Sequence, residues 1–405
     1  MEANFLEHYQ EIISLGLVDN RYPLDHACVQ LPNGWYGIDS ILTGFQKVLD
    51  KYMYDEMLVP TVSTNAIFKQ IPDEIKDNID QSVLTITHTG LHKLDDPFYL
   101  SGRPDLVAPQ IEKYNCRSYR DLPVRRALRY FRYIKTNFPK EVSLITDTEY
   151  PALDAEGIFA TEEEYLEESS KVLNDFRKFL EEKLRLSVFT ARTKYALVFY
   201  TIFPDLSVLE VARLNLFGRD LAEKLEFTVL ESNNKPAPPC IFDLNITSKM
   251  FAAVVATHSV PHRVVLPSYC MRVFGTSYGV DVSGLKGLRI DQSRIEFTPE
   301  RFAKQLAQGA IFALKPAEGG SVCIVTEGGE TVVEAAALEA KLAEIVEKRE
   351  VELAKKEKET FQERLGKAVQ YIKKDAAVPE GYAVLGAKED DPETLVVAKT
   401  FLPSQ

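Results

Sequence analysis

Residues 118–161 contain two apolar, aromatic-rich runs separated by a polar turn, and this pattern constrains the fold more than any other stretch. The turn covers 136–140 and includes Pro139, which predicts a hairpin of two antiparallel strands. The first run carries arginines at Arg125, Arg126, Arg129 and Arg132, and the second carries acids at Glu141, Asp147, Glu149, Asp154 and Glu156. Guanidinium groups pair phosphate oxygens two at a time, so such a hairpin is suited to holding a triphosphate. An amphipathic hairpin with ordinary surface charge is the alternative.

The composition is that of an ordinary globular protein. A chain of 405 residues predicts two or three domains, and 45% hydrophobic with 27% charged residues is a common balance. The net charge is −12. Proteins that wrap nucleic acids usually show a basic face, so this charge argues against a nucleic-acid partner, although an acidic chain can carry a local basic patch.

Cysteine and histidine spacing give no sign of a metal site. The five cysteines contain no CxxC pair and the six histidines show no ligand spacing, so we expect neither zinc nor a disulfide framework. The first residues, MEANFLEHYQEIISLGL, have acids where a secretory or mitochondrial leader needs basic residues. No apolar run reaches the length of a membrane span. We therefore expect a cytoplasmic, reducing compartment.

Regular periodicities flank the hairpin on both sides. Apolar residues recur at helical spacing from Ile38 to Tyr52, and a short strand ending at Pro60 follows them. An amphipathic helix is predicted over 161–185, because Thr161 and Glu164 form a capping-box pattern at its start. Further strands are expected at 271–274, 310–314 and 321–326, and further helices at 298–308 and 334–366.

Several stretches resemble prolyl-tRNA synthetases of the archaeal and eukaryotic type, which are class II enzymes. The sequence SYRDLP at 118–123 looks like the lead into motif 2, and Phe131-Arg132 looks like the opening of that motif. Residues 36–60 resemble motif 1, the helix and strand of the dimer interface, and 241–270 resemble motif 3. The resemblance covers almost the whole chain.

This resemblance implies an α+β fold. We expect a class II aminoacyl-tRNA synthetase-like antiparallel sheet flanked by helices, plus a smaller α/β anticodon-binding-like domain. The expected parts are a catalytic-fold domain at 1–270, a shortened anticodon-binding-like domain at 271–366, and a degenerate C-terminal domain at 367–405 that lacks the family's zinc cysteines. Through 36–60, the resemblance implies a homodimer or a complex with another protein.

The positions that carry the family's chemistry differ in this chain. Ile134 stands where motif 2 has an acid, and 146–148 stand where the second run has arginines. Loss of cations at these places removes the clamp that stabilises charge on a reacting phosphate. If the match to motif 2 were shifted by a few residues, Arg126 or Arg129 would serve as that clamp instead.

A few residues remain as candidates for a site, although none is assigned as catalytic. Arg132 and Lys249 are candidate remnants of an ATP site, and Lys249 replaces the motif 3 arginine without its planar fork. The candidates for a substrate pocket are Asp105, Glu156, Glu210 and His258. Asp105 takes the place of a family glutamate in an ungapped match, whereas a gapped match puts Val107 there.

Two functions from different classes follow. The first is a synthetase-like protein that has lost aminoacylation and acts as a binding, structural or regulatory subunit of a larger assembly, without a cofactor. The second is a ligase that uses ATP and magnesium to activate an amino acid or another small carboxylic acid without normal tRNA charging. Thr326 and Glu327 stand where the family has paired arginines, which argues against tRNA binding. The exchanges together favour the first function.

Overall fold

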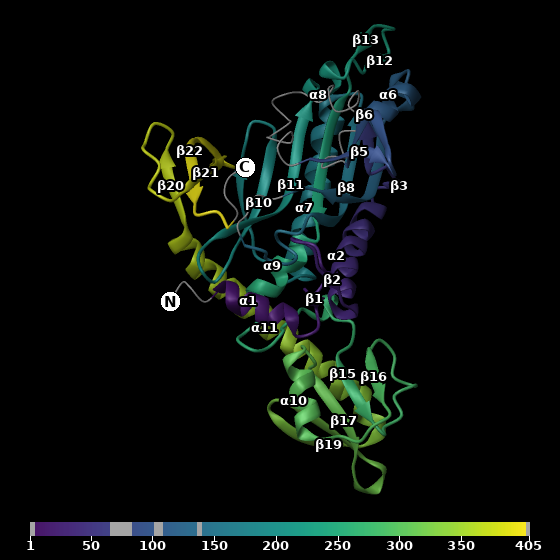
Figure 1. Ribbon diagram of the computed structural model, residues 1–405, viewed down its shortest axis with the longest axis vertical. Helices are drawn as coiled ribbons and strands as arrows, with labels where there is room; N and C mark the ends of the chain where they lie inside the picture. Colours follow the sequence, from purple (N-terminus) through teal and green to yellow (C-terminus); the bar gives the residue numbers. More distant parts are fainter. Residues whose placement is uncertain (1–4, 65–82, 101–107, 136–139, 402–405) are drawn as a thin grey trace.

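The computed structural model describes residues 5–64, 83–100, 108–135 and 140–401 (Figure 1). A ten-stranded sheet runs through the larger part of the molecule in the order β20-β22-β21-β9-β10-β11-β14-β8-β7-β3. Its central strands are β10 (Ala196–Ile202), β11 (Val208–Gly218), β14 (Cys240–Thr247), β8 (Glu149–Phe159) and β7 (Val124–Tyr133). Neighbours among these strands are antiparallel, whereas the edge strand β3 (Asp55–Leu58) runs parallel to β7. The expected antiparallel sheet is therefore confirmed, with one parallel pair at its edge.

The predicted hairpin is confirmed as β7 and β8. The two strands pair continuously from Val124 opposite Ile158 to Tyr133 opposite Glu149. The connection between them is longer than the expected turn, because the last backbone bond runs from Ile134 N–H to the Thr148 carbonyl at 2.9 Å. Residues 141–148 fold back toward the N-terminal segment, where the Thr148 N–H donates to the His26 carbonyl at 2.7 Å.

Three helices cover one face of this sheet: α2 (Pro32–Asp50), α7 (Glu162–Glu182) and α9 (Lys249–His258). Their apolar side chains and those of the central strands form one continuous core. Glycine permits the close approach of α2 to α9, since a Cβ on Gly37 would lie 2.2 Å from the Phe251 ring. The predicted cap of α7 is confirmed, because the Thr161 hydroxyl accepts from the Glu164 N–H at 3.3 Å.

A smaller unit follows and lies at the lower end of Figure 1. Its five-stranded sheet has the order β16-β15-β17-β18-β19 and mixes parallel and antiparallel pairs. Its elements are β15 (Gly275–Tyr278), β16 (Ile290–Ser293), α10 (Pro299–Ala307), β17 (Phe312–Pro316), β18 (Val322–Thr326) and β19 (Gly329–Val333). The strand expected at 271–274 begins four residues later, at Gly275. Met271 and Phe274 are buried in a core that contains residues of both units, such as Phe45 and Phe312, so this segment connects the two units.

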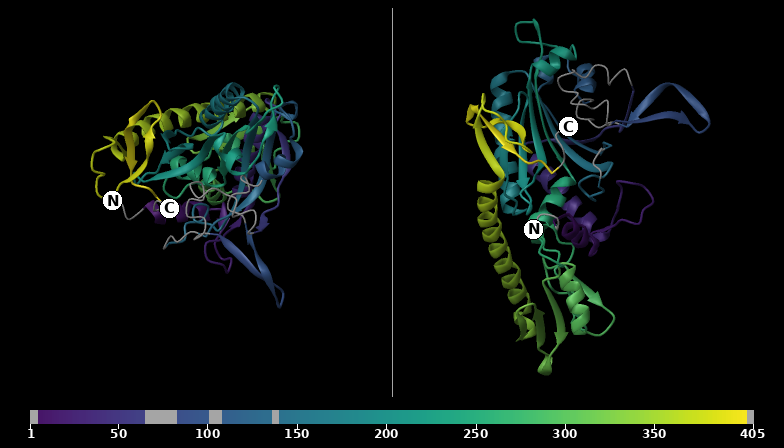
Figure 2. Two further views of the ribbon diagram at one scale, coloured as in Figure 1. Left: turned by 90° about the horizontal axis from the view of Figure 1, so that it is seen from above. Right: turned by 60° about the vertical axis from the view of Figure 1, so that its left-hand side comes forward.

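The chain returns to the large sheet through one long helix. Helix α11 (Leu338–Ala368) leads from the smaller unit back along the side of the main sheet (Figure 2). The strands after it are β20 (Val369–Lys373), β21 (Ala383–Lys388) and β22 (Asp391–Ala398). They extend the main sheet beyond β9 (Phe189–Arg192), where Ala387 pairs with Arg192. The domain boundary at 367 stays a prediction, but the strands that follow it share the main sheet and do not form a sheet of their own.

The remaining elements are short, and one group projects from the body. Strands β4 (Val62–Thr64), β5 (Leu84–Thr89) and β6 (His92–Leu100) form a separate sheet, and the β5–β6 hairpin extends outward in Figure 2. The others are α1 (Phe5–Ser14), β1 (Val18–Asp19), β2 (Val29–Gln30), α6 (Ala108–Asn115), α8 (Asp220–Lys224), β12 (Val229–Leu230) and β13 (Pro236–Ala237). Among the described residues, no helix combines the length and the apolar character that a membrane crossing requires.

Candidate functional site

The face of the main sheet opposite α2, α7 and α9 carries polar side chains on four neighbouring strands. Directly opposite residues in antiparallel strands point to the same face. Arg213, Asn245 and Asp154 therefore form one row across β11, β14 and β8, and Asn215, Asp243 and Glu156 form the next. We use the term polar face for Tyr130, Arg132, Asp154, Glu156, Glu210, Arg213, Asn215, Asp243 and Asn245.

Hydrogen bonds within the polar face connect β7, β8 and β14. The buried Tyr130 hydroxyl donates to Asp154 Oδ2 at 2.7 Å, and Asn245 Nδ2 donates to that hydroxyl at 3.0 Å. The same Asn245 amide also donates to Asp154 Oδ1. Arg132 Nη1 donates to Asn245 Oδ1 at 3.3 Å. The carboxylate of Asp154 is thus held by neutral donors on the two adjacent strands.

Two further pairs on the polar face are also held internally. Asn215 Nδ2 lies 3.0 Å from both carboxylate oxygens of the buried Asp243. Arg213 grips Glu210 with two hydrogen bonds of 2.8 Å, from Nε and from Nη2. Burial opposes ionisation of Glu210, but the Arg213 charge and its hydrogen bonds outweigh this cost, so the pKa of Glu210 is lowered. The bidentate pair therefore stays charged, and Arg213 is engaged by a carboxylate of its own strand.

Three of the four hairpin arginines are bound by carboxylates elsewhere in the fold. Arg125 Nε pairs with Glu168 of α7 at 2.7 Å and Arg126 Nε with the buried Glu112 of α6 at 3.0 Å. Arg129 Nε pairs with Glu56 of β3 at 2.7 Å. These ion pairs engage Arg126 and Arg129, the residues that a shifted match to motif 2 would have used as clamps.

Arg132 and Lys249 are the cations that the described part of the chain leaves without an ion-paired carboxylate beside the polar face. Lys249 is half-buried at the first position of α9, with Nζ 4.7 Å from the centre of the Tyr150 ring. Burial, followed by repulsion from Arg132, lowers the pKa of Lys249 to about 8, although Glu210 and Asp147 oppose the shift. The fold thus brings three candidate residues together: Arg132, Lys249 and Glu210.

Asp147 is a buried acid. In the sequence it is one of three residues, 146–148, that stand where the family has arginines. Its Oδ2 accepts from the Leu144 N–H at 3.0 Å and from the Cys28 thiol at 3.4 Å. Within the described residues, its Oδ1 has no hydrogen-bond partner. Burial raises the pKa of Asp147 to about 7. This loop therefore places an acid that titrates near neutral pH within electrostatic reach of Lys249.

Of the other candidates, Glu156 lies on the polar face, His258 lies apart from it, and Asp105 falls outside the described residues. His258 is buried at the end of α9, where its Nε2 lies 3.2 Å from the Leu184 carbonyl oxygen, and burial lowers its pKa to about 4. Nine helical residues place it about 13 Å along the axis from Lys249. Glu156 is buried in the sheet between Arg126 and Asp243. The positions proposed for the family glutamate, at 105 and 107, fall outside the described residues.

Six residues of the polar face were not among the candidates from the sequence: Tyr130, Asp154, Arg213, Asn215, Asp243 and Asn245. The alternation of Asp243, Asn245 and Thr247 along an otherwise apolar strand is the signal that could have found a second row of polar residues. In the described part of the chain, no three His, Cys, Asp or Glu side chains converge as metal ligands would. Chemically, the site offers two neighbouring cations at the margin of a face rich in carboxylates.

Comparisons with curated proteins and with solved structures both find prolyl-tRNA synthetases. No family model matches the chain. It is 23% identical over 274 residues to the proline–tRNA ligase of Methanopyrus kandleri, covering 65% of the chain and 56% of the relative. It is 25% identical over 278 residues to that of Methanoculleus marisnigri, covering 66% of the chain and 57% of the relative. The chain thus spans less than two thirds of the length of these relatives.

Solved structures extend the likeness to nearly the whole fold. The Giardia lamblia prolyl-tRNA synthetase in complex with prolyl-adenylate matches with a TM-score of 0.87 at 15% identity, over 99% of both chains. The Cryptosporidium parvum prolyl-tRNA synthetase complexed with halofuginone and AMPPNP gives 0.83 at 14% identity, over 97% of this chain and 94% of that one. The chain is therefore prolyl-tRNA synthetase-like in sequence, and the expected class II fold is confirmed.

Proposed function

We propose that this prolyl-tRNA synthetase-like protein does not form an aminoacyl adenylate and acts as a binding, structural or regulatory subunit of a larger assembly. The observation that carries the proposal is the internal pairing of the hairpin cations. Arg125, Arg126 and Arg129 are each bound by a carboxylate of another element. A guanidinium committed to such a pair is not available to a triphosphate unless the pair is broken.

Charge on the polar face supports the same proposal. Adenylate formation needs preorganised cations at the phosphates, and loss of one such group typically costs about 3 kcal/mol of transition-state stabilisation. Four carboxylates lie on this face, at Asp154, Glu156, Asp243 and Glu210. Lys249 supplies at most a point charge, and its pKa of about 8 leaves part of the population neutral at pH 8.

A second candidate is a ligase that activates an amino acid or another small carboxylic acid with ATP and magnesium. Its support is the pair Arg132 and Lys249, whose charges are close enough for Arg132 to depress the Lys249 pKa. Within the described ranges neither cation is ion-paired with a carboxylate, and two such neighbouring cations attract an anion, such as a carboxylate or a phosphate. Both residues are needed for this candidate, so a substitution of either tests it.

We also propose that 36–60 forms a protein interface, either with a second copy or with another chain. Strand β3 is the edge of the main sheet, and an exposed edge is a template for pairing. Leu58 in this strand is 83% exposed, and Met53 just before it is 74% exposed. An unpaired sheet edge that exposes a large apolar side chain such as Leu58 supports an interface there.

The smaller unit supports a role without tRNA. Glu327, at the place of a family arginine, forms an ion pair with Arg263. The pair adds no net positive charge at that position, and contacts of positive charges with the phosphate backbone supply a large share of nucleic-acid affinity. We expect the purified protein to show no salt-dependent tRNA binding in a filter or mobility assay, and salt-dependent binding in either assay would contradict this part of the proposal.

Pyrophosphate exchange with ATP and proline tests the main proposal. We expect exchange at the background level from protein that is shown to be folded by circular dichroism. Exchange well above background, abolished by Arg132→Gln and retained in Arg120→Gln, would overturn the proposal in favour of a ligase. Arg120 is an exposed arginine outside the polar face, so it is a matched control for the loss of one charge. Light scattering of the same sample tests the interface. A mass of one chain, together with no partner in the native source, would contradict it.

A further inference from the structure

The amine of Lys249 lies beside Arg132 at one end of the main sheet. Arg132, near the end of β7, and Tyr150, near the start of β8, are directly opposite residues, so their side chains point to the same face. Lys249 opens α9 just after β14, and its Nζ lies 4.7 Å from the centre of the Tyr150 ring. The amine and the guanidinium therefore both lie next to Tyr150.

These two cations keep hydrogen-bonding capacity that the protein does not use. A guanidinium presents five N–H donors. Within the described residues, the bond from Arg132 Nη1 to Asn245 Oδ1 at 3.3 Å is the one hydrogen bond that this group donates. Arg132 and Lys249 are both half-buried and thus partly open to solvent. A small anion from solution can therefore reach both groups.

The surroundings favour the free amine of Lys249. Burial and the charge of Arg132 lower the pKa of Lys249 from the usual 10.5 to about 8, although Glu210 and Asp147 act in the opposite direction. The start of a helix carries partial positive charge, and α9 has no acid in its first turn to offset it. At pH 7, the fraction of free amine is therefore more than about a hundredfold higher than for an ordinary lysine. A lysine that is desolvated beside another cation is an activated nucleophile.

From this arrangement, we propose that Lys249 forms a reversible imine with a small 2-oxo acid whose carboxylate is bound by Arg132. The amine nitrogen attacks the carbonyl carbon and a C–N bond forms, while the carbonyl oxygen leaves as water with the two protons of the amine. The step needs no oxidant or reductant, and water reverses it. A 2-oxo acid fits because its carboxylate is attached directly to the carbonyl carbon, as the two cations lie side by side.

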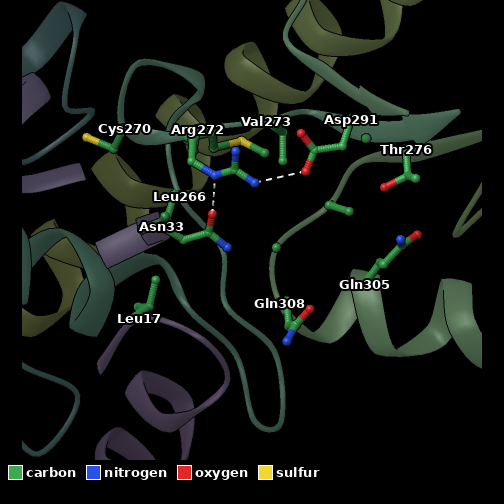
Figure 3. Close-up of a pocket in the computed structure, with 14 residues that line it drawn as sticks. Leu17, Asn33, Leu266, Cys270, Arg272, Val273, Thr276, Asp291, Gln305 and Gln308 are labelled. Carbon is green, nitrogen blue, oxygen red and sulfur yellow. Dashed lines mark hydrogen bonds and ion pairs between the residues drawn. The ribbon is translucent and has the colours of Figure 1, made fainter. Parts of the chain in front are cut away.

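The pocket at the junction of the two units lacks this combination (Figure 3). Its arginine, Arg272, donates to Asn33 Oδ1 at 2.9 Å and to Asp291 Oδ2 at 2.8 Å, so a carboxylate of the protein already neutralises it. No lysine is among the described residues that line this pocket. The end of the sheet that carries Arg132 and Lys249 is therefore the better place for such a ligand.

This inference rests on the proposed function, because a Lys249 engaged by a triphosphate would not be free to react with a carbonyl group. The imine gives the site a ligand in a protein that forms no adenylate. Pyrophosphate exchange tests the proposed function without a carbonyl compound, and the imine is tested without ATP. The two failures are therefore measured separately.

Reductive trapping with glyoxylate and cyanoborohydride tests the proposal, and glycolaldehyde is the matched compound that lacks a carboxylate. Hydride adds to the imine carbon, so peptide mass spectrometry locates a carboxymethyl group from glyoxylate and a hydroxyethyl group from glycolaldehyde. At pH 7, we expect glyoxylate to modify Lys249 at least about tenfold faster than Lys348, an exposed lysine of α11. This ratio should be about tenfold higher with glyoxylate than with glycolaldehyde, because only glyoxylate forms charged hydrogen bonds with Arg132.

Arg132→Gln separates anion binding from the reactivity of the amine. It should remove the preference for glyoxylate and raise the pH midpoint of modification above 8, because repulsion by Arg132 is lost. Arg120→Gln, exposed and outside the polar face, should leave both unchanged. Competition in the parent protein needs no variant, since propionate should slow modification of Lys249 but not of Lys348.

Three results would overturn the proposal. The first is modification of Lys249 no faster than that of Lys348 with glyoxylate. The second is the same ratio for the two carbonyl compounds, with no effect of propionate. The third is an unchanged preference for glyoxylate in a folded Arg132→Gln variant.

Discussion

The acid at Asp147 gives a pH dependence of stability whose size follows from the structure. Asp147 is 4% exposed, and burial raises the pKa of its carboxyl from the usual 3.8 to about 7. The folded protein therefore holds this proton more tightly than the unfolded chain does. The stabilisation from the protonated carboxyl is complete below pH 3.8 and is lost as the pH rises through about 7.

The perturbation we propose is Asp147→Asn, which keeps the shape and removes the charge. A separation of about three pKa units corresponds to about 4 kcal/mol at full ionisation, which is the upper bound of the gain. The amide oxygen can still accept from the Leu144 N–H, while the Cys28 thiol contact is a weak one. We therefore expect the variant to be more stable than the parent by about 2–4 kcal/mol at pH 8, and about equal to it near pH 4.

Urea unfolding at several pH values between 4 and 8 measures this difference. Asp25→Asn is the matched control, because Asp25 lies exposed in the N-terminal segment that also contains Cys28. We expect the control to follow the parent at every pH. A variant that is less stable than the parent at pH 8, or a difference that does not shrink toward pH 4, would refute the reasoning.

Three further predictions concern the polar face and the helix layer. Tyr130→Phe removes the hydroxyl that joins β7 to β8 and β14, and we expect the free energy of unfolding in urea to fall by about 1–3 kcal/mol; no loss would contradict the network. Gly37→Ala places a methyl group about 2.2 Å from the Phe251 ring and should cost about 1–3 kcal/mol, whereas Gly366→Ala in open space on α11 should stabilise by about 1 kcal/mol. Thermal unfolding compares the two variants, and a shift of the unfolding temperature in the same direction for both would contradict the close packing at Gly37. Acetylation of Lys249 followed by mass spectrometry should show a midpoint near pH 8, and a midpoint above 10 would contradict its burial.

Local sequence patterns predicted the helices and strands whose ends are set by residues a few positions away. The helix expected at 161–185 is α7, and Thr161 caps it because the required donor lies three residues away in the sequence. The hairpin followed from two apolar runs and a turn. Its loop was longer than expected, because residues 141–148 are held by the distant His26 and Cys28, which no local pattern reveals.

The environment of the candidate residues was harder to predict, because their partners lie across the fold. Arg126 and Arg129 looked available in the sequence, yet their carboxylates come from α6 and β3. His258 matched a family histidine, but the direction of its side chain depends on where α9 ends against Leu184. Arg132, Lys249 and Glu210 were chosen from the resemblance, and only the packing of α9 against the sheet brings their charges together.

The two faces of the sheet explain how the fold and the site chemistry can vary independently. On the helix-covered face, close packing at Gly37 fixes the approach of α2 to α9, and a change there disturbs the core. On the polar face, each buried carboxylate needs a donor, and Asp154 and Asp243 obtain theirs from Tyr130, Asn215 and neighbouring strands. A chain can therefore keep the class II architecture while its polar residues bind one another. Freeing Arg125 or Arg126 from its ion pair would leave Glu168 or Glu112 buried without that partner, so binding a phosphate at either arginine would require more than one change.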